Sequence, residues 1–213
     1  MFLDDRLKEF GNVPFNKATL INVLPKYKSL NDKVSKLIKE GKLIQLKRGL
    51  YLVSSKITKK QNSLEVIANS LYGPSCISLD YALSYYGFIP ERVFKVTSVT
   101  TGAKKQYSNS LAAFEYYHLP DSLFSIGIIT SKTPDGSTFL IASKEKALCD
   151  KLLLSKNFRI NSMKTLREFL LSDLRIDIDM FKGLNTDLID GYIKVGFKKQ
   201  SLLLLKRFIA EVS

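Results

Sequence analysis

Residues 29–53 read SLNDKVSKLIKEGKLIQLKRGLYLV, and this stretch decides the fold of the N-terminal part of the chain. Ser29 can cap the start of a helix through its hydroxyl group. The apolar residues after it recur at i, i+4, i+7 and i+8, and they share one side of a helix: Leu30, Val34, Leu37 and Ile38. Gly41 then suits the end of a helix. The pattern therefore predicts an amphipathic helix between Ser29 and Gly41.

The opposite side of this predicted helix is polar and basic. It carries Asp32, Ser35, Lys36 and Lys39, with Asn31 and Lys33 on its flanks. Short polar groups near the start and cations along the length suit the major groove of DNA. A lysine-rich outer face is also common on helices that only meet solvent, so the neighbouring elements decide between the two interpretations.

Two short β-like segments follow the helix, at residues 43–46 and 50–53. Lys47-Arg48-Gly49 separates them, and glycine permits the positive φ that a tight hairpin often requires. Upstream, Asn16 can cap a helix that runs to about Leu24, where Pro25 stops it and residues 26–28 form a turn. The order is helix, turn, helix and hairpin, which predicts a winged helix-turn-helix over residues 1–55.

Charge is concentrated in the same region. The 213-residue chain has a net charge of +13, and residues 1–60 hold 14 Lys and Arg against 5 Asp and Glu, a net +9. The remaining residues hold 19 against 15, a net +4. Such a field attracts a polyanion, and counterion release from phosphates would supply much of the affinity for DNA.

A membrane is the competing anionic partner, and the sequence argues against it. No segment approaches the roughly 20 apolar residues that cross a bilayer. The first residues, MFLDDRLKEF, are acidic early and lack the apolar region of a signal peptide. We therefore expect a cytoplasmic protein without a membrane partner.

Cysteine and histidine content argues against a metal site. Cys76 and Cys149 lie 73 positions apart in apolar surroundings, and His118 is the single histidine. This set cannot supply a zinc site, and nothing near His118 supports a catalytic Cys-His pair. We expect buried, reduced thiols, no metal and no cofactor.

The polar stretch SSKITKKQNS at residues 54–63 predicts a linker, with boundaries at 56–63 between an N-terminal domain of residues 1–55 and a C-terminal domain of residues 64–213. Lys56, Lys59 and Lys60 of the linker could follow a phosphate backbone or simply meet solvent. The whole chain is expected to be α+β.

The C-terminal domain is predicted as a mixed α/β unit with a helical end. Predicted helices cover residues 64–71, 78–86, 144–154, 163–171, 187–195 and 198–212, and predicted strands cover residues 93–101, 113–119, 123–130 and 138–142. Pro134-Asp135-Gly136 marks a hairpin turn between the last two strands. Lys104 and Lys105 after Gly102 could form a second basic patch or only a loop.

Three stretches resemble the AbiEi family, the antitoxin and transcriptional regulator of type IV toxin-antitoxin and abortive-infection systems. They are GKLIQLKRGLYLV at residues 41–53, GPSCISLDYALSYYGFIPERVFKVTSVT at residues 73–100, and SKEKALCDKLLL at residues 143–154. The first is shared by many winged-helix proteins, whereas the second followed by the third is more specific.

The resemblance implies a winged helix that binds inverted repeats in the protein's own promoter and a C-terminal domain that mediates antitoxicity. It implies a nucleotidyltransferase toxin as functional partner without a stable complex, and it is compatible with a monomer that binds DNA cooperatively. The family's basic helix and wing correspond here to Lys33, Lys36, Lys39, Lys47 and Arg48. The resemblance brings no catalytic motif.

The leading expectation is thus a sequence-specific repressor with antitoxin activity and no enzymatic activity. Asn31, Ser35 and Lys36 would meet base edges, while Lys39, Lys47 and Arg48 would hold phosphates. With roughly five to eight phosphates neutralised, log affinity should fall against log salt with a slope of about −4 to −7.

Two other classes compete with this expectation. A nuclease would need a magnesium site, and Pro134-Asp135 with Glu145-Lys146 only loosely echoes the PD-(D/E)xK arrangement. An RNA-binding protein would expose aromatic rings for stacking, and the candidates are Tyr81, Tyr85, Tyr86, Tyr116 and Tyr117. Tyr81 and Tyr85 are one helical turn apart beside Ala82 and Leu83, which favours packing in the core.

Overall fold

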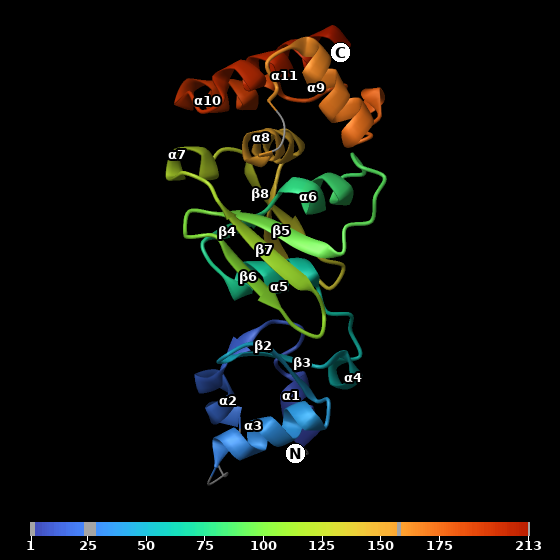
Figure 1. Ribbon diagram of the computed structural model, residues 1–213. Coiled ribbons are helices and arrows are strands. Elements are labelled where there is room, and N and C mark those ends of the chain that lie inside the picture. Colours follow the sequence, from blue (N-terminus) through green and yellow to red (C-terminus); the bar gives the residue numbers. More distant parts are fainter. Residues whose placement is uncertain (1–2, 24–28, 157–158, 213) are drawn as a thin grey trace.

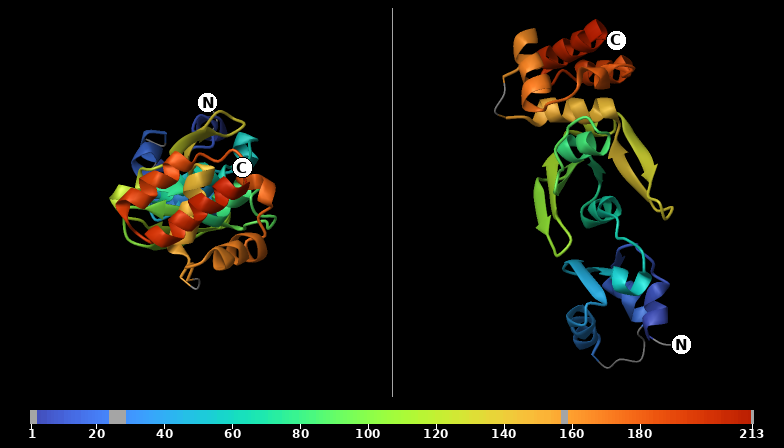
Figure 2. Two further views of the ribbon diagram at one scale, coloured as in Figure 1. Left: turned by 90° about the horizontal axis from the view of Figure 1, so that it is seen from above. Right: turned by 90° about the vertical axis from the view of Figure 1, so that its right-hand side faces the viewer.

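The chain folds as an α+β protein with two separate sheets, as the computed structural model shows (Figure 1). The structure describes residues 3–23, 29–156 and 159–212. The N-terminal unit lies at one end of an elongated molecule, the larger sheet lies in the middle, and the C-terminal helices lie at the other end (Figures 1 and 2).

The N-terminal unit combines short helices with a small antiparallel sheet. Its elements are α1 (Leu3–Lys8), β1 (Phe15–Asn16), α2 (Lys17–Val23), α3 (Leu30–Lys39), β2 (Leu43–Lys47) and β3 (Leu50–Val53). The strand order is β1-β3-β2. The predicted helix after Ser29 and both hairpin strands are therefore confirmed.

Local capping explains where these helices begin. The Ser29 side chain accepts a hydrogen bond from the backbone N–H of Asp32 at 3.5 Å, and the Asn16 side chain accepts one from the N–H of Thr19 at 2.9 Å. Gly41 follows α3 with a φ of 67°, which favours glycine at the end of a helix. The predicted turn at residues 26–28 lies outside the described residues.

The predicted linker begins with a turn of helix, α4 (Ser55–Thr58). Ser54 caps this helix by accepting from the N–H of Lys56 at 3.3 Å, and Ile57 packs against the N-terminal core. The first residues of this stretch are therefore part of the N-terminal unit.

A six-stranded mixed sheet forms the centre of the C-terminal part. Its strands are β4 (Ser75–Ile77), β5 (Lys95–Thr100), β6 (Lys105–Ser108), β7 (Ala113–His118), β8 (Ile128–Lys132) and β9 (Thr138–Ala142). They lie in the order β6-β7-β5-β4-β9-β8. The β5–β7 and β4–β9 pairs are parallel, and the other three are antiparallel.

Helices cover both faces of this sheet (Figure 2). The helices of the C-terminal part are α5 (Leu64–Leu71), α6 (Leu79–Tyr85), α7 (Asp121–Phe124), α8 (Lys144–Leu154), α9 (Met163–Arg167), α10 (Thr186–Val195) and α11 (Lys199–Val212). α5 packs on one face, toward the N-terminal unit, while α6 and α8 lie on the other (Figure 1). Since both faces are covered, the central strand β5 is buried from Val96 to Thr100.

The last helices form a further layer over α8. A π-helical segment (Glu168–Asp173) extends α9, and a 3-10 turn (Ile178–Phe181) precedes α10. Leu202 and Leu205 of the apolar run in α11 are buried, whereas Leu203 is exposed. Within the described ranges, no helix combines the length and the apolar character needed to cross a bilayer.

Three expectations for the sheet region were wrong in detail. Strands β4 and β6 were not predicted, although β4 lies near the middle of the sheet. Residues 121–124 form α7, so the strand predicted from residue 123 begins only at Ile128. The buried residues of α6 are Leu79, Ala82 and Leu83, and Tyr85 is 47% exposed.

The β2–β3 hairpin is buried on both faces, which joins the two parts of the molecule. Leu43, Tyr51 and Val53 belong to the core of the N-terminal unit. Leu46 and Leu52 belong to the core of the larger C-terminal part. The strands alternate their side chains between the two cores, as the period of two requires.

Candidate nucleic-acid interface

Helix α3 presents its polar face at the end of the molecule remote from the large sheet (Figure 1). Val34 and Leu37 are buried against the N-terminal core, and Leu30 and Ile38 pack partly against it. These contacts fix which side of the helix meets solvent. Among the described residues, the outer side is exposed from Asn31 to Lys39.

Most of the predicted contact residues on α3 are exposed. Asn31, Ser35, Lys36 and Lys39 meet solvent, and Lys33 is half-buried. Lys36 lies 3.9 Å from Glu40, a long and exposed ion pair that holds the side chain weakly. Asp32 is an acidic group on the same face. It lies near the start of the helix, where its negative charge interacts favourably with the helix dipole and stabilises the helix.

A contact that the sequence did not indicate ties α3 to α2. The Nζ of Lys17 donates a hydrogen bond of 2.5 Å to Oδ1 of Asn31. Lys17 is the first residue of α2, so its charge lies beside the start of α3. Lys17 thus joins the residues that could meet a polyanion at this end of the molecule.

Lys47 is not available as the wing-tip phosphate contact that the sequence predicted. Its Nζ donates to the carbonyl oxygen of Leu71 at 2.5 Å and lies 5.6 Å from the centre of the Tyr107 ring. Both partners belong to the C-terminal part, which covers the hairpin. Lys47 is half-buried, and its ammonium group is engaged with the C-terminal part instead of projecting freely from the turn.

Arg48, the next residue, is exposed at the hairpin turn. Gly49 makes the turn possible with a φ of 80°. Beside the tip, Asn109 of the β6–β7 turn approaches the carbonyl oxygen of Leu46 at 3.5 Å. Of the two predicted tip cations, only Arg48 points into solvent.

The acidic residues considered for a nuclease serve local structure instead. Asp135 accepts hydrogen bonds within its own turn from Thr133 and Ser137, and these bonds lower the pKa of its carboxyl. Asn12 of the N-terminal unit also donates to Asp135, at 3.4 Å. Glu145 accepts from Ser143 at 2.8 Å. Across the described ranges, no group of three or more His, Cys, Asp or Glu residues could hold a metal.

The tyrosines considered for RNA stacking are mostly held by hydrogen bonds. Tyr116 is buried and donates to the carbonyl oxygen of Ala68 at 2.6 Å, and Tyr86 donates to that of Ala142 at 2.8 Å. Tyr81 donates to Glu65 at 2.6 Å. A hydroxyl group that is fixed in this way holds the tyrosine ring in place, so the ring is not available to stack on a base.

A buried ionic network lies where α8 meets the end of β4. The Nζ of Lys146 is 3.3 Å from Oδ2 of Asp150, and both side chains are fully buried. Ser78 and Tyr192 donate to the two carboxylate oxygens at 2.7 and 2.6 Å, and Lys146 also donates to Tyr192 at 2.9 Å. Every strong acceptor is thus satisfied, which is the condition for burying such a pair.

This network and the cysteines beside it are shielded from water. Burial raises the pKa of the Asp150 carboxyl above its ordinary value of 3.8, although Lys146 and the two hydroxyl groups oppose the shift. Cys76 and Cys149 are free and buried, as expected, and burial raises the pKa of the Cys76 thiol to about 12. Thiols in this state are poor nucleophiles.

Lys104 and Lys105, for which the sequence allowed either a basic patch or a loop, lie on different surfaces. Lys104 lines a cleft beside α8, together with Lys151 and Lys156. Lys105 is exposed on β6, at the edge of the sheet. The cleft was not predicted, because its lysines come from segments about 50 residues apart in the sequence.

No protein-family model matches the chain, and no curated protein matches it either.

Proposed function

We propose that this protein is a sequence-specific DNA-binding repressor of its own operon, with a winged helix-turn-helix as its N-terminal domain. In this proposal α2 and α3 form the helix-turn-helix, and α3 lies in the major groove. The protein acts in the cytoplasm and has no enzymatic activity of its own.

The observation that carries the proposal is the exposed polar face of α3. Its short polar side chains lie near the start of the helix and its lysines follow, at the end of the molecule that the C-terminal part leaves open. The net charge of +9 in residues 1–60 supplies the long-range attraction to DNA.

Roles can be assigned to individual side chains. Asn31, Ser35 and Lys36 read base edges, where an amide, a hydroxyl and an ammonium group offer hydrogen bonds. Lys39 and Arg48 hold phosphates and position the helix. Lys33 and Lys17 add positive charge around the start of α3, whereas Lys47 takes no part.

The buried hairpin narrows the proposed interface. One face of the β2–β3 hairpin packs against the C-terminal part, so that face cannot contact DNA. In the proposed complex, α3 therefore provides most of the contacts. We therefore expect roughly four to six neutralised phosphates, and a slope of about −4 to −5 in log affinity against log salt.

We further propose an antitoxin role toward a nucleotidyltransferase toxin in a type IV toxin-antitoxin system. This part rests on the resemblance of residues 41–53, 73–100 and 143–154 to the AbiEi family. Binding to inverted repeats in the promoter, cooperative assembly of monomers on DNA, and the absence of a stable complex with the toxin belong to the same proposal.

A mobility-shift titration on the DNA upstream of the gene tests the DNA-binding proposal. We expect a specific complex that weakens steeply with salt and that a scrambled duplex of the same composition does not compete away. An affinity without salt dependence, or equal affinity for single-stranded RNA, would contradict the proposal.

If the gene next to this one encodes a nucleotidyltransferase, its co-expression with this protein tests the antitoxin role separately. The full chain should restore growth. The variant with Lys36→Ala and Lys39→Ala should lose repression and still restore growth, since the two roles use different domains. Failure of the full chain to restore growth would remove the antitoxin role and leave the DNA-binding proposal intact.

A further inference from the structure

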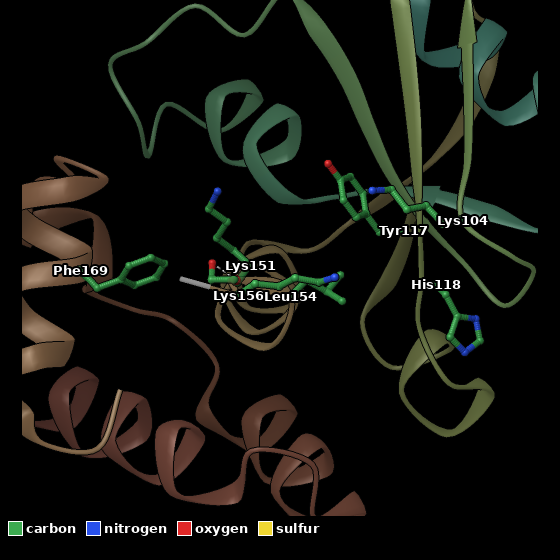
Figure 3. A pocket seen from close by; sticks show the side chains of 8 residues that line it. Lys104, Tyr117, His118, Lys151, Leu154, Lys156 and Phe169 are labelled. Atoms are coloured by element: carbon green, nitrogen blue, oxygen red, sulfur yellow. Dashed lines mark hydrogen bonds between the residues drawn. The ribbon is translucent and has the colours of Figure 1, made fainter. Parts of the chain in front are cut away.

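A basic cleft lies in the C-terminal part, between the β6–β7 side of the sheet and the end of α8 (Figure 3). Its volume is about 710 Å³, within the range of small-molecule sites. Lys104 and Tyr117 lie on one side. Lys151 lies in the last turn of α8 and Lys156 just after it, and Phe169 faces them from the π-helical segment that follows α9 (Figure 3). Helix α8, whose last turn borders the cleft, lies far from α3 along the molecule (Figure 1).

The charge of this cleft is strongly positive. Three lysines line it, and no aspartate or glutamate does so among the described residues. Lys151 is paired with Asp80 at 2.6 Å, which holds its ammonium group in place, and Asp80 lies in the adjoining smaller cavity. Lys104 and Lys156 are exposed, so their charges are available to an anion.

Hydrogen bonds fix the wall that Lys104 belongs to. The Nζ of Lys104 lies 5.3 Å from the centre of the Tyr117 ring, and the Tyr117 hydroxyl donates to Glu115 at 2.6 Å. Glu115 is also paired with Lys95 at 2.7 Å. The Glu115 carboxylate is thus held by Lys95 and by the Tyr117 hydroxyl, and Lys104 also lies close enough to attract it.

His118 adds a polar group at the margin of the cleft. Its Nδ1 lies 3.0 Å from the carbonyl oxygen of Gly102. A carbonyl oxygen can only accept, so Nδ1 carries the hydrogen in this contact, which leaves Nε2 for another partner. That nitrogen can form a hydrogen bond with a ligand hydroxyl group.

The end of α8 is held in place as well. Lys198 donates to the carbonyl oxygens of Leu152 and Ser155 at 3.2 and 3.0 Å. These bonds satisfy acceptors that the last turn of a helix leaves open. The backbone that carries Lys156 is thus anchored to the start of α11.

We propose that this cleft binds a nucleoside di- or triphosphate. A single orthophosphate would fill little of the volume and would leave part of the lysine charge uncompensated. Half-buried Leu154 and the largely buried Phe169 line the apolar side of the cleft for a base, the lysines hold the phosphate chain, and Nε2 of His118 forms a hydrogen bond with a ribose hydroxyl.

Isothermal titration of the full-length protein with ATP, GTP, CTP and UTP tests this proposal. At least one of them should bind, and orthophosphate and the free nucleoside should each bind at least about tenfold more weakly. The variants Lys104→Gln and Lys156→Gln should each weaken nucleotide binding by about tenfold or more. Lys105→Gln is the matched control, because Lys105 neighbours Lys104 but does not line the cleft.

Several outcomes would overturn the proposal: no heat with any of the four nucleotides, equal binding of the free nucleoside, or equal loss in Lys105→Gln. Binding of single-stranded RNA alone would show that the cleft serves a polymer. Thermal unfolding of each variant checks that it folds. Binding of duplex DNA by α3 is measured independently, so failure here leaves the repressor proposal untouched.

Discussion

The Nζ of Lys47, at the end of β2, lies 2.5 Å from the carbonyl oxygen of Leu71, the last residue of α5. This hydrogen bond joins the hairpin to the C-terminal part. Leu71 ends its helix, so its carbonyl oxygen lacks an intrahelical partner, and the ammonium group of Lys47 supplies one.

Lys47→Met should therefore affect stability and not DNA binding. The methionine keeps the packing of the lysine stem but loses the hydrogen bond, and the free energy of unfolding should fall by about 1 kcal/mol. Urea denaturation measures this loss. A clear fall in DNA affinity at equal stability would show that Lys47 contacts phosphate after all.

Arg48→Met should give the opposite pattern, since Arg48 is exposed. Its stability should be close to that of the parent, while affinity should fall to a similar extent for specific and random duplexes. The salt slope should become shallower by about 1. Mobility-shift titrations at several salt concentrations measure both effects.

Lys36→Ala should weaken binding to the operator by about 1 to 3 kcal/mol and binding to random DNA by much less. The reason is that a base contact is lost on one sequence only, whereas Lys39 still holds the phosphate backbone. The comparison of the two duplexes is the measurement. If both lose equal affinity, Lys36 is a phosphate contact and the base-reading role moves elsewhere on α3.

The buried pair of Lys146 and Asp150 should respond asymmetrically to mutation. Asp150→Ala leaves a buried ammonium group without its carboxylate and should lower the free energy of unfolding by about 3–5 kcal/mol. Lys146→Met should lower it less, because burial already raises the pKa of Asp150 and the carboxyl group can take up a proton.

The sign of the pH effect follows for Lys146→Met. In that variant the pKa of Asp150 in the folded state lies above its unfolded value, so the folded state binds the extra proton and gains stability as pH falls. The loss in free energy of unfolding relative to the parent protein should thus be smaller at acid pH than at neutral pH, as measured by urea denaturation. A deficit that does not change with pH would mean that Asp150 stays ionised.

Alkaline pH should destabilise the whole protein. Burial raises the pKa of the Cys76 thiol from 9.0 to about 12, and burial also raises the pKa of the Tyr86 phenol from 10.0 to about 12. The unfolded chain releases these protons near the ordinary values and the folded chain retains them, so stability falls as pH rises above about 9. The phenolate absorbance of the buried tyrosines should appear together with unfolding, and phenolate formation in the intact fold would contradict this.

The sequence was a good guide where a periodic pattern is long. Helices α3 and α8 and the hairpin strands were predicted because their apolar residues repeat, and Ser29 was expected to cap α3. Strand β4 was missed because three residues, Ser75 to Ile77, cannot show a period. Strand β4 is formed by its hydrogen bonds with β5 and β9, whose residues are distant in the sequence.

The direction of Lys47 could not be predicted, because it depends on the packing of the hairpin against α5. One signal was nevertheless present. The run Leu50-Tyr51-Leu52-Val53 is apolar at every position, which is typical of a strand buried on both faces, whereas a free wing would alternate apolar and polar residues. No local sequence pattern indicated the basic cleft, because Lys104 and Lys156 come to line the same cleft only in the folded chain.

The shared hairpin also bears on how this protein can be cut or recombined. A fragment ending near residue 60 would expose Leu46 and Leu52 to water. The remainder of the chain would lose the hairpin residues that cover part of its hydrophobic core. Either fragment would tend to aggregate. Transplanting α3 with its hairpin onto another scaffold would therefore require redesign of the side of β2 and β3 that carries Leu46 and Leu52.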